Sequence, residues 1–529
     1  MAKRVSTKSV FPETQREHIK QLIEWMSQGV YEKEQIIAVA LLCAVAGENM
    51  FLLGPPGTAK SMVASRLKMV FKNGKSFDYL MSRFSTPDEI FGPISISRLK
   101  NEDKYERLVA GYLPEADVVF LDEIWKAGPS IQNTLLTVIN EHIFHNGGQT
   151  LRTPMKVLIA ASNELPAKDE GLEALWDRFL MRMVSNCIES DATFFKMLKS
   201  EQTELKPLSE QLYITTELYD KWQKESRSVT MSDSVVSAIK SLRKLLTNHE
   251  KEDSNQLRYY VSDRRWRKAY RLMQTSAYLN GRDEIDLTDY LLLIHSFWND
   301  VETIPNVLAA FTSSISEATT KQLNKIDKSI RQMMIPQNNQ VANKPSGINI
   351  NATEFAEYDY FYYFVENFPD GEAYFSKWDY ASLTTTPRDG VRYYDSKRKK
   401  IVIHSLIPGR PFDAKSQNAS NLIKVKIQKC QDGAIIDGTP YSFRKRNQHR
   451  TVGNVIQPLP VFQRIAAIQD TFRECVGQWE SLIEKNWTNC DNIFLSSADL
   501  ALVNNMMKEV SELIKTTEVK LNNVVMLIK

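Results

Sequence analysis

The amino-acid sequence predicts an α/β protein with a mostly parallel sheet, followed by a helical bundle that carries an inserted small β-rich domain. Short β-branched runs alternate with segments of helical spacing over residues 14–200, which is the pattern of a parallel sheet covered by helices. The composition becomes aromatic and strand-like over residues 354–456, and helical spacing returns over residues 457–529. The helices on either side of the β-rich segment are therefore expected to pack together.

The first strand-like run, residues 49–53, is followed by a glycine- and proline-rich turn at residues 54–61 and then by helical spacing. Strand, glycine-rich turn and helix in this order are typical of a loop whose backbone N–H groups hold phosphate oxygens. In this interpretation Lys60 neutralises the β- and γ-phosphates of ATP, and Ser61 ligates Mg²⁺. The predicted nucleotide-binding residues of this loop are Gly54, Pro55, Pro56, Gly57, Thr58, Ala59, Lys60 and Ser61.

Ala59 departs from the strict loop motif, because a glycine is expected at its position. We expect Ala59 to enter the helix with a negative φ, where a methyl group is tolerated. A plain glycine–proline turn between strand and helix is the alternative for the whole loop. That alternative does not explain why Lys60 and Ser61 follow immediately.

A second strand-like run, residues 117–121, ends in Asp122 and Glu123. Because ligands bind at the carboxyl ends of buried parallel strands, we expect both acids to serve the nucleotide. Asp122 would hold the Mg²⁺ shell, and Glu123 would orient and polarise the attacking water. The alternative is a strand that ends in two solvated acids.

A third strand-like run, residues 157–162, is followed by Asn163. Runs and motifs in this order resemble the AAA+ ATPases, in which a sensor asparagine lies on the strand beside the acidic motif. The resemblance implies that Asn163 helps to place the attacking water. An Asx turn is the purely structural alternative for this residue.

The segments 82–93, 111–116, 121–129 and 133–141 resemble the MoxR group of AAA+ proteins, and within it most closely the RavA family, the regulatory ATPase variant. The resemblance covers about half of the chain, residues 29–298. It implies a P-loop AAA+ core with a parallel sheet and a helical lid, and ATP and Mg²⁺ as cofactors.

The resemblance also assigns roles to single residues. Arg178 matches the arginine finger that reaches the γ-phosphate of the neighbouring subunit; Arg182 is the alternative finger, and a surface ion pair is the structural alternative. Arg264 matches a second sensor at the start of a lid helix, although the sequence does not separate it from Arg265. Tyr31 is expected to stack on or flank adenine, with a packed surface tyrosine as the alternative.

The domain boundaries follow from these motifs and from the changes in composition. The predicted domains are an AAA+ α/β core at 14–200, a helical lid at 205–300, a long helix and linker at 301–353, a β-rich domain at 354–456, and C-terminal helices at 457–529 that pack with 301–336.

Local turn signals refine two of these domains. The core carries two insertions, residues 92–111 and 142–154, which we interpret as β-hairpins. Asp-Gly pairs at 389–390, 432–433 and 437–438 predict turns in the β-rich domain, for which a barrel is one arrangement. The RavA family has a β module that recruits a partner, but the residues here do not match that module closely. Its partner is therefore not carried over.

The composition restricts the remaining possibilities. With 67 basic and 64 acidic side chains the formal charge is +3, which is not the basic excess of a nucleic-acid-binding protein. The five cysteines are scattered and form no C-x-x-C pair, which favours free thiols in a reducing compartment. No apolar stretch is long enough to span a bilayer, and the cytoplasm is the expected location. Basic runs at 397–400 and 444–446 would suit single-stranded nucleic acid, but a strand edge blunted by lysine is the favoured interpretation.

The resemblance implies an ATP-dependent, chaperone-like remodelling ATPase of the MoxR/RavA type. It would form a ring homo-oligomer, expected to be a hexamer, act on protein clients and work with a von Willebrand A domain protein. The alternative function is a nucleic-acid-dependent AAA+ motor, related to restriction-type or helicase ATPases. A nucleotide-gated scaffold that barely hydrolyses ATP is a third hypothesis, against which the presence of Lys60 and Glu123 argues.

Overall fold

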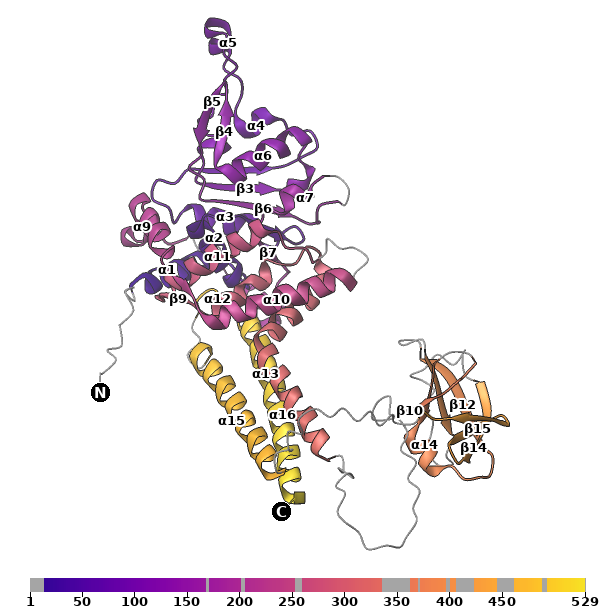
Figure 1. The fold of residues 1–529 in the computed structure, drawn as a ribbon. Helices are drawn as coiled ribbons and strands as arrows, with labels where there is room; N and C mark the ends of the chain where they lie inside the picture. Colours follow the sequence, from indigo (N-terminus) through magenta and orange to yellow (C-terminus); the bar gives the residue numbers. More distant parts are fainter. Residues whose placement is uncertain are drawn as a thin grey trace, which may run out of the picture. The chain divides into compact units, whose positions relative to one another are not determined.

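The chain forms two compact units, residues 1–336 together with 460–529, and residues 337–459 (Figure 1). The computed structural model describes residues 14–167, 171–200, 205–252, 259–334, 362–369, 372–395, 400–405, 423–444, 461–487 and 492–528.

The first unit is built on a five-stranded sheet with the strand order β2-β3-β6-β1-β7, in which every pairing is parallel. Its central strands are apolar and buried because helices lie on both faces of the sheet (Figure 1). The predicted α/β class is therefore confirmed. The strands are β1 (Met50–Leu53), β2 (Ser76–Leu80), β3 (Val118–Asp122), β6 (Val157–Ser162) and β7 (Met181–Val184).

The helix before β1, α2, is buried over nearly its whole length and contacts β6, β7 and two lid helices. A helix with neighbours on all sides is apolar all round rather than along one stripe. The helices of this core are α1 (Thr14–Met26), α2 (Glu34–Ala46), α3 (Lys60–Lys68), α4 (Pro87–Phe91), α5 (Ile96–Glu102), η1 (Leu113–Glu115), η2 (Ile124–Lys126), α6 (Pro129–Glu141), α7 (Glu173–Trp176) and α8 (Asp191–Lys199).

The second core insertion is the β-hairpin that the sequence predicts. β4 (Ile143–Asn146) pairs antiparallel with β5 (Gln149–Arg152), and Asn146 lies opposite Gln149. Gly147 and Gly148 form the two-residue turn with φ values of 57° and 87°, the region in which glycine is favoured.

The first core insertion is not the β-hairpin that we expected. Only one antiparallel bridge, Ile94 with Arg107, remains of the pairing, and α5 forms its tip (Figure 1). The reason is local: the hydroxyl of Ser95 accepts a hydrogen bond from the backbone N–H of Arg98 and caps the helix. The side chain of Asn146 accepts from the N–H of Arg107 and donates to its carbonyl oxygen, which ties the two insertions together.

The helical lid follows the core, and its helix α11 packs on α2 and α9. A short parallel pair, β8 with β9, joins the segment before α10 to the segment after α11. The lid elements are η3 (Glu210–Leu212), α9 (Thr216–Ser226), β8 (Thr230–Met231), α10 (Asp233–Glu252), α11 (Asp263–Leu279), β9 (Glu284–Ile285), α12 (Leu287–Leu291), η5 (Leu292–His295) and η6 (Val301–Thr303).

The helices before and after the second unit pack together, as the sequence predicts for its helical bundle. α13 (Ile304–Met334) lies along α16 (Ser497–Ile528) and α15 (Val461–Asn486), and it also contacts α10 (Figure 1). The predicted end of the long helix at Pro336 and the linker 337–351 lie outside the described residues. None of the helices in the described part of the chain is long and apolar enough to cross a bilayer. The bundle core contains Leu323, Ile326, Ile330, Ile465, Phe472, Leu521 and Val524.

The second unit is a closed barrel. Its sheet has the order β10-β11-β13-β12-β14-β15-β16. An antiparallel bridge between Val365 and Phe443 joins the first strand to the end of the last one, and the N–H of Arg444 donates to the carbonyl oxygen of Phe364 at 3.0 Å. The elements are β10 (Tyr362–Val365), β11 (Ala373–Ser376), α14 (Lys377–Ser382), β12 (Arg388–Asp395), β13 (Lys400–Ser405), β14 (Ile423–Cys430), β15 (Gly433–Ile436) and β16 (Thr439–Ser442).

One of the turns predicted for this unit is wrong. Asp389 and Gly390 lie inside β12, where the carboxylate of Asp389 pairs with the ammonium of Lys426 on the neighbouring strand at 2.6 Å. Cross-strand pairing thus overrides the local preference of an Asp-Gly pair for a turn. Asp437 and Gly438 do form a turn, with φ values of 49° and 83°.

The pair at 432–433 lies at the turn between β14 and β15. The basic residues 397–399 and 445–446 lie outside the described residues.

Candidate nucleotide-binding site

The predicted phosphate loop leaves the carboxyl end of β1 and enters α3. A Cβ atom at Gly54 would lie 2.2 Å from the carbonyl oxygen of Ser185, so this close approach of two backbones requires glycine. Gly57 has a φ of 81°, which also favours glycine. The hydroxyl of Ser185 donates to the carbonyl oxygen of Thr58 at 3.0 Å, which fixes the far side of the loop.

The expectation for Ala59 is wrong. Ala59 is the N-cap of α3 and has a φ of 63°, in the left-handed region. That conformation brings Cβ close to the following carbonyl oxygen and costs about 1–2 kcal/mol for a residue other than glycine. The strict motif has a glycine at this position because the residue that enters the helix has a positive φ. In this chain an alanine adopts that conformation and is strained.

Replacing Ala59 with glycine is expected to stabilise the first unit by about 1 kcal/mol, because the strain is removed at a smaller cost in chain entropy. The melting temperature should rise by about 2 °C, with ATP turnover within twofold of the unaltered protein. Ala309→Gly, on the exposed face of α13, is the control and should lower the melting temperature. A lower melting temperature for Ala59→Gly would contradict the strain.

Lys60 lies inside the loop rather than in solvent. Its side chain is buried, and its Nζ donates to the carbonyl oxygens of Gly54 at 2.6 Å and Pro55 at 2.9 Å. The ammonium is therefore held over the loop's own backbone, and its neutralisation of phosphate oxygens stays a prediction.

The two predicted metal ligands lie on one pocket. Ser61, in the first turn of α3, and Asp122, at the end of β3, line a cavity of about 560 Å³, together with Asp78, Tyr79 and other residues. A hydroxyl and a carboxylate are oxygen ligands of the kind that Mg²⁺ takes, and the ion commonly fills its other positions with water and phosphate oxygens. The residues present therefore fit Mg²⁺.

Glu123 occupies an unusual backbone position next to Asp122. Its φ and ψ are 52° and 44°, and its N–H donates to Oδ1 of Asp122 at 3.0 Å. Strained backbone of this kind is common at functional sites. Its carboxylate Oε2 lies 3.4 Å from the hydroxyl of Ser162 and 3.5 Å from Nζ of Lys126.

Sequence reasoning missed Ser162. Ser162 is the last residue of an otherwise apolar strand. A polar residue at the end of a buried run needs a hydrogen-bond partner, and this requirement could have indicated a role for Ser162 from the sequence. Asn163 follows it and is exposed. β3 and β6 pair in parallel, with Asp122 opposite Ala161. Glu123 and Asn163 therefore follow the ends of two neighbouring strands. The sensor role of Asn163 stays a prediction.

Two of the four arginines considered in the sequence are buried in structural roles. The guanidinium of Arg182 donates to the carbonyl oxygens of Trp298 and Trp176 and lies over the Trp176 ring, 3.8 Å from its centroid. Arg265 donates to Ser296 and Asn299, and burial lowers its pKa to about 10. Both guanidinium groups are therefore engaged by contacts within their own chain, and the choice of Arg178 and Arg264 over these two neighbours stays a prediction.

Arg178 and Arg264 instead form one cationic face. The side chain of Arg178 donates to the carbonyl oxygen of Ala174 at 2.7 Å, and exposed Arg264 lies 3.4 Å from the amide oxygen of Asn140. Burial, and then the positive charge of Arg264, lower the pKa of Arg178. Neither residue lines the pocket of Ser61 and Asp122.

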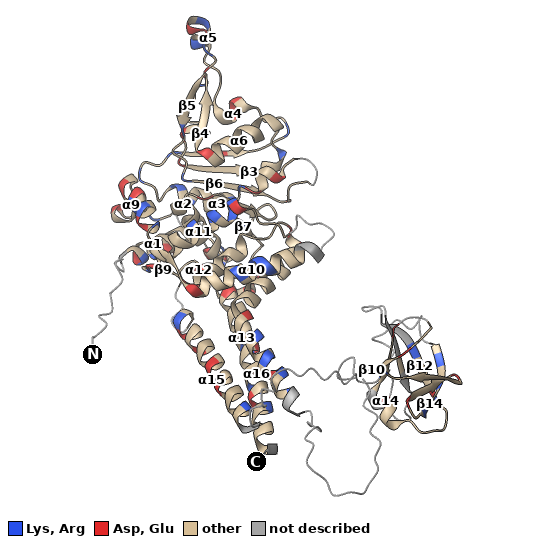
Figure 2. Ribbon diagram, viewed as in Figure 1, with Lys and Arg blue, Asp and Glu red and all other residues tan. Residues whose placement is uncertain are grey.

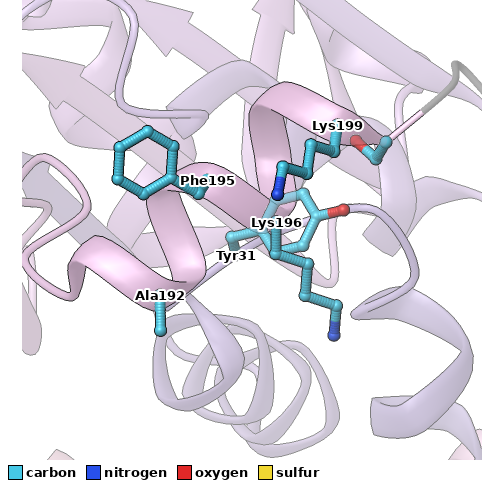
Figure 3. A pocket seen from close by; sticks show the side chains of 6 residues that line it. Tyr31, Ala192, Phe195, Lys196 and Lys199 are labelled. Atoms are coloured by element: carbon cyan, nitrogen blue, oxygen red, sulfur yellow. The ribbon is translucent and has the colours of Figure 1, made fainter.

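Tyr31 lines a different cavity, of about 520 Å³, beneath α8 (Figure 3). Its ring lies beside Lys196, whose Nζ is 6.0 Å from the ring centroid. The segment that carries Tyr31 is held to the residues just before α8 by Glu32. The carboxylate of Glu32 accepts hydrogen bonds from the backbone N–H groups of Glu189 and Ser190. Since Tyr31 is not on the pocket of the metal ligands, its contact with adenine stays a prediction.

Comparison with known proteins agrees with this architecture. Residues 17–223 match the family described as "MoxR domain in the MoxR-vWA-beta-propeller ternary systems", and residues 234–311 match the "AAA lid domain" family. An uncharacterized protein of Methanocaldococcus jannaschii is 37% identical over 286 residues, which are 54% of this chain and 71% of that protein. A second is 36% identical over 320 residues, 59% of this chain and 82% of that protein. The chaperone MoxR1 of Mycobacterium tuberculosis is 27% identical over 155 residues, 28% of this chain and 40% of that protein.

A parallel sheet, a phosphate loop and a lid define an AAA+ ATPase. The chain belongs to the MoxR group of these ATPases. The closer resemblance to the RavA family stays a prediction, and the two family matches do not extend beyond residue 311.

Proposed function

We propose that this chain binds ATP with Mg²⁺ and hydrolyses it in a ring oligomer, a hexamer, in order to assemble, mature or remodel partner protein complexes. The observation that carries the proposal is the pocket shared by Ser61 and Asp122, with Glu123 beside it. Phosphoryl transfer needs little covalent chemistry from a protein, so positioned charges and a positioned water account for most of the catalysis. ATP supplies the phosphoryl group and Mg²⁺ neutralises charge on it.

Ring assembly is supported by the cationic face of Arg178 and Arg264. The two guanidinium groups repel each other, and both would be stabilised by an anion. Since they lie off the pocket of their own chain's metal ligands, we propose that they face the triphosphate of the neighbouring subunit. An arginine finger, supplied by the same subunit or by its partner, stabilises the charge on the γ-phosphate in the transition state and can raise the rate by orders of magnitude.

A partner is suggested by the description of the matched family, which names MoxR, vWA and β-propeller proteins together. We propose a von Willebrand A domain protein as the adaptor of this chain, and the bundle and barrel as modules that hold an adaptor or client. The four cysteines in the described part of the chain are unpaired, which supports a reducing compartment, the cytoplasm.

Replacing Lys60 with alanine is expected to weaken Mg·ATP binding about 10- to 100-fold, because a charge-assisted contact to phosphate is lost. Isothermal titration with a slowly hydrolysed ATP analogue measures this. Lys72→Ala is the matched control, because Lys72 lies on the surface and pairs with Glu210 at 3.3 Å. Equal affinity for the Lys60 variant and the unaltered protein would remove Lys60 from the site.

The alternative function, a nucleic-acid-dependent motor, is tested by measuring phosphate release from ATP with and without DNA or RNA. Phosphate release that is stimulated by DNA or RNA, with a steep salt dependence, would favour it over a protein-remodelling function. Along α13, α15 and α16, basic and acidic residues are interspersed (Figure 2). A surface of this kind favours protein partners over a phosphate backbone.

A further inference from the structure

Ser162 contacts both halves of the proposed catalytic site. It lies at the carboxyl end of β6, the strand between β1 and β3, and its side chain is fully buried. Its carbonyl oxygen accepts the N–H of Gly54, the first residue of the phosphate loop, at 3.0 Å. Its hydroxyl lies 3.4 Å from Oε2 of Glu123. One residue therefore joins the loop that holds phosphate to the acid that is proposed to orient water.

The direction of the hydroxyl proton follows from the neighbours. A serine hydroxyl has one proton and accepts through its lone pairs. The N–H of Glu164 donates to the oxygen of Ser162 at 3.3 Å, which uses a lone pair. The proton is then available to the carboxylate of Glu123, an acceptor when ionised.

A second donor reaches the same carboxylate oxygen. Nζ of Lys126, at the end of η2, lies 3.5 Å from Oε2 of Glu123. The Lys126 side chain is 44% exposed, so solvent screens this pair and its contribution is small. Ser162 is buried and lies in the sheet, so of the two donors to Glu123 it is the one whose position is fixed. Oε1 is the carboxylate oxygen that neither donor reaches.

We propose that Ser162 is a positioning residue for ATP hydrolysis. Its hydroxyl holds Oε2 of Glu123 so that Oε1 faces the attacking water, and its backbone keeps that carboxylate in register with the phosphate loop. Hydrogen bonds of catalytic groups that are long in the resting site shorten in the reacting complex. The inference rests on the proposed function, because it needs Glu123 to act in hydrolysis.

The test compares steady-state kinetics of Ser162→Ala with the unaltered full-length protein. We expect kcat to fall about 10- to 100-fold, the effect of losing a hydrogen bond to a charged group. KM for ATP and the affinity for a slowly hydrolysed analogue should stay within twofold. Ser162→Thr keeps the hydroxyl and should recover most of kcat, whereas Lys126→Met should lower kcat only a few-fold.

A double-mutant cycle separates positioning from a structural effect. If Ser162 acts through the carboxylate, Ser162→Ala should not lower the residual single-turnover rate of Glu123→Gln any further. Ser276→Ala is the matched control, because Ser276 is also a fully buried serine that donates to a carboxylate, Asp289, at 2.6 Å, but in the lid. Its kcat should stay within twofold.

Two outcomes would overturn the inference alone. One is an unchanged kcat for Ser162→Ala while Glu123→Gln is inactive. The other is an equal further loss when Ser162→Ala is added to Glu123→Gln, which would mean a general structural defect. Full turnover by Glu123→Gln would instead overturn the proposed role of Glu123, and the inference with it.

Discussion

Replacing Glu123 with glutamine is expected to stop ATP turnover and to leave ATP binding intact. The amide has nearly the same shape as the carboxylate but carries no charge, so it polarises a water molecule poorly and accepts no proton. Loss of general acid–base assistance typically lowers a rate about 10²- to 10⁴-fold. Single-turnover phosphate release measures the chemical step, and equilibrium binding of ATP measures the site.

The structure gives this prediction its specificity. Asp122 and Glu123 are adjacent, but Asp122 lines the pocket of Ser61, whereas the carboxylate of Glu123 contacts Ser162 and Lys126. Asp122→Asn should therefore lower the affinity for Mg²⁺ and for Mg·ATP, so that more Mg²⁺ is needed for turnover, whereas Glu123→Gln should leave both affinities unchanged.

A surface acid is the control for charge removal. Glu210, whose side chain is 80% exposed and pairs with Lys72, should tolerate the change to glutamine with turnover within twofold. If Glu123→Gln releases phosphate at the normal rate, the water is oriented by another group and the assignment is wrong.

The sequence predicts the phosphate loop well because the motif is local and carries its own backbone requirements. Gly54 and Gly57 are explained by a close approach and a positive φ, features that only glycine meets without strain. The same reasoning failed at Ala59, because the sequence does not reveal that the helix entry itself is left-handed.

Two segments were harder to predict, one because of a helix cap and the other because of pairing with neighbouring strands. The insertion at 92–111 has strand-like apolar residues, but the cap formed by Ser95 turns its tip into α5. Asp389 and Gly390 have turn chemistry, but both pair with β14, and Gly390 also pairs with β13, which holds them in β12. In each case a single cap or two neighbouring strands outweigh the local preference.

The arginines show the same limit at the candidate site. Motif matching selects Arg178 and Arg264 and leaves Arg182 and Arg265 as neighbours that the sequence does not separate. The structure shows that they differ in burial: Arg182 and Arg265 are fully enclosed and donate to backbone carbonyl oxygens, whereas Arg264 is exposed. Burial of a charged side chain depends on the whole packed unit, so no local pattern reports it.

Replacing Arg178 with alanine is expected to lower kcat about 10³- to 10⁵-fold, the range found when an arginine finger is removed. The affinity for Mg·ATP should change little, because the proposed role of Arg178 lies at the neighbouring subunit and in the transition state. Arg473→Ala is the matched control, since the side chain of Arg473 is 72% exposed on α15, and it should keep full turnover.

Co-expression of two inactive chains tests whether Arg178 acts across the interface. In rings that mix Arg178→Ala with Glu123→Gln, some interfaces join an intact Glu123 site to a neighbour with an intact Arg178. With equal and random mixing, about one quarter of the head-to-tail interfaces have this composition, so the mixed rings should regain about a quarter of the normal turnover. An arginine that serves its own subunit would give mixed rings that are as inactive as either parent, because no chain would then hold both groups. Recovery therefore requires both a ring and a finger supplied in trans, and its absence in rings that have been shown to mix would contradict the assignment of Arg178.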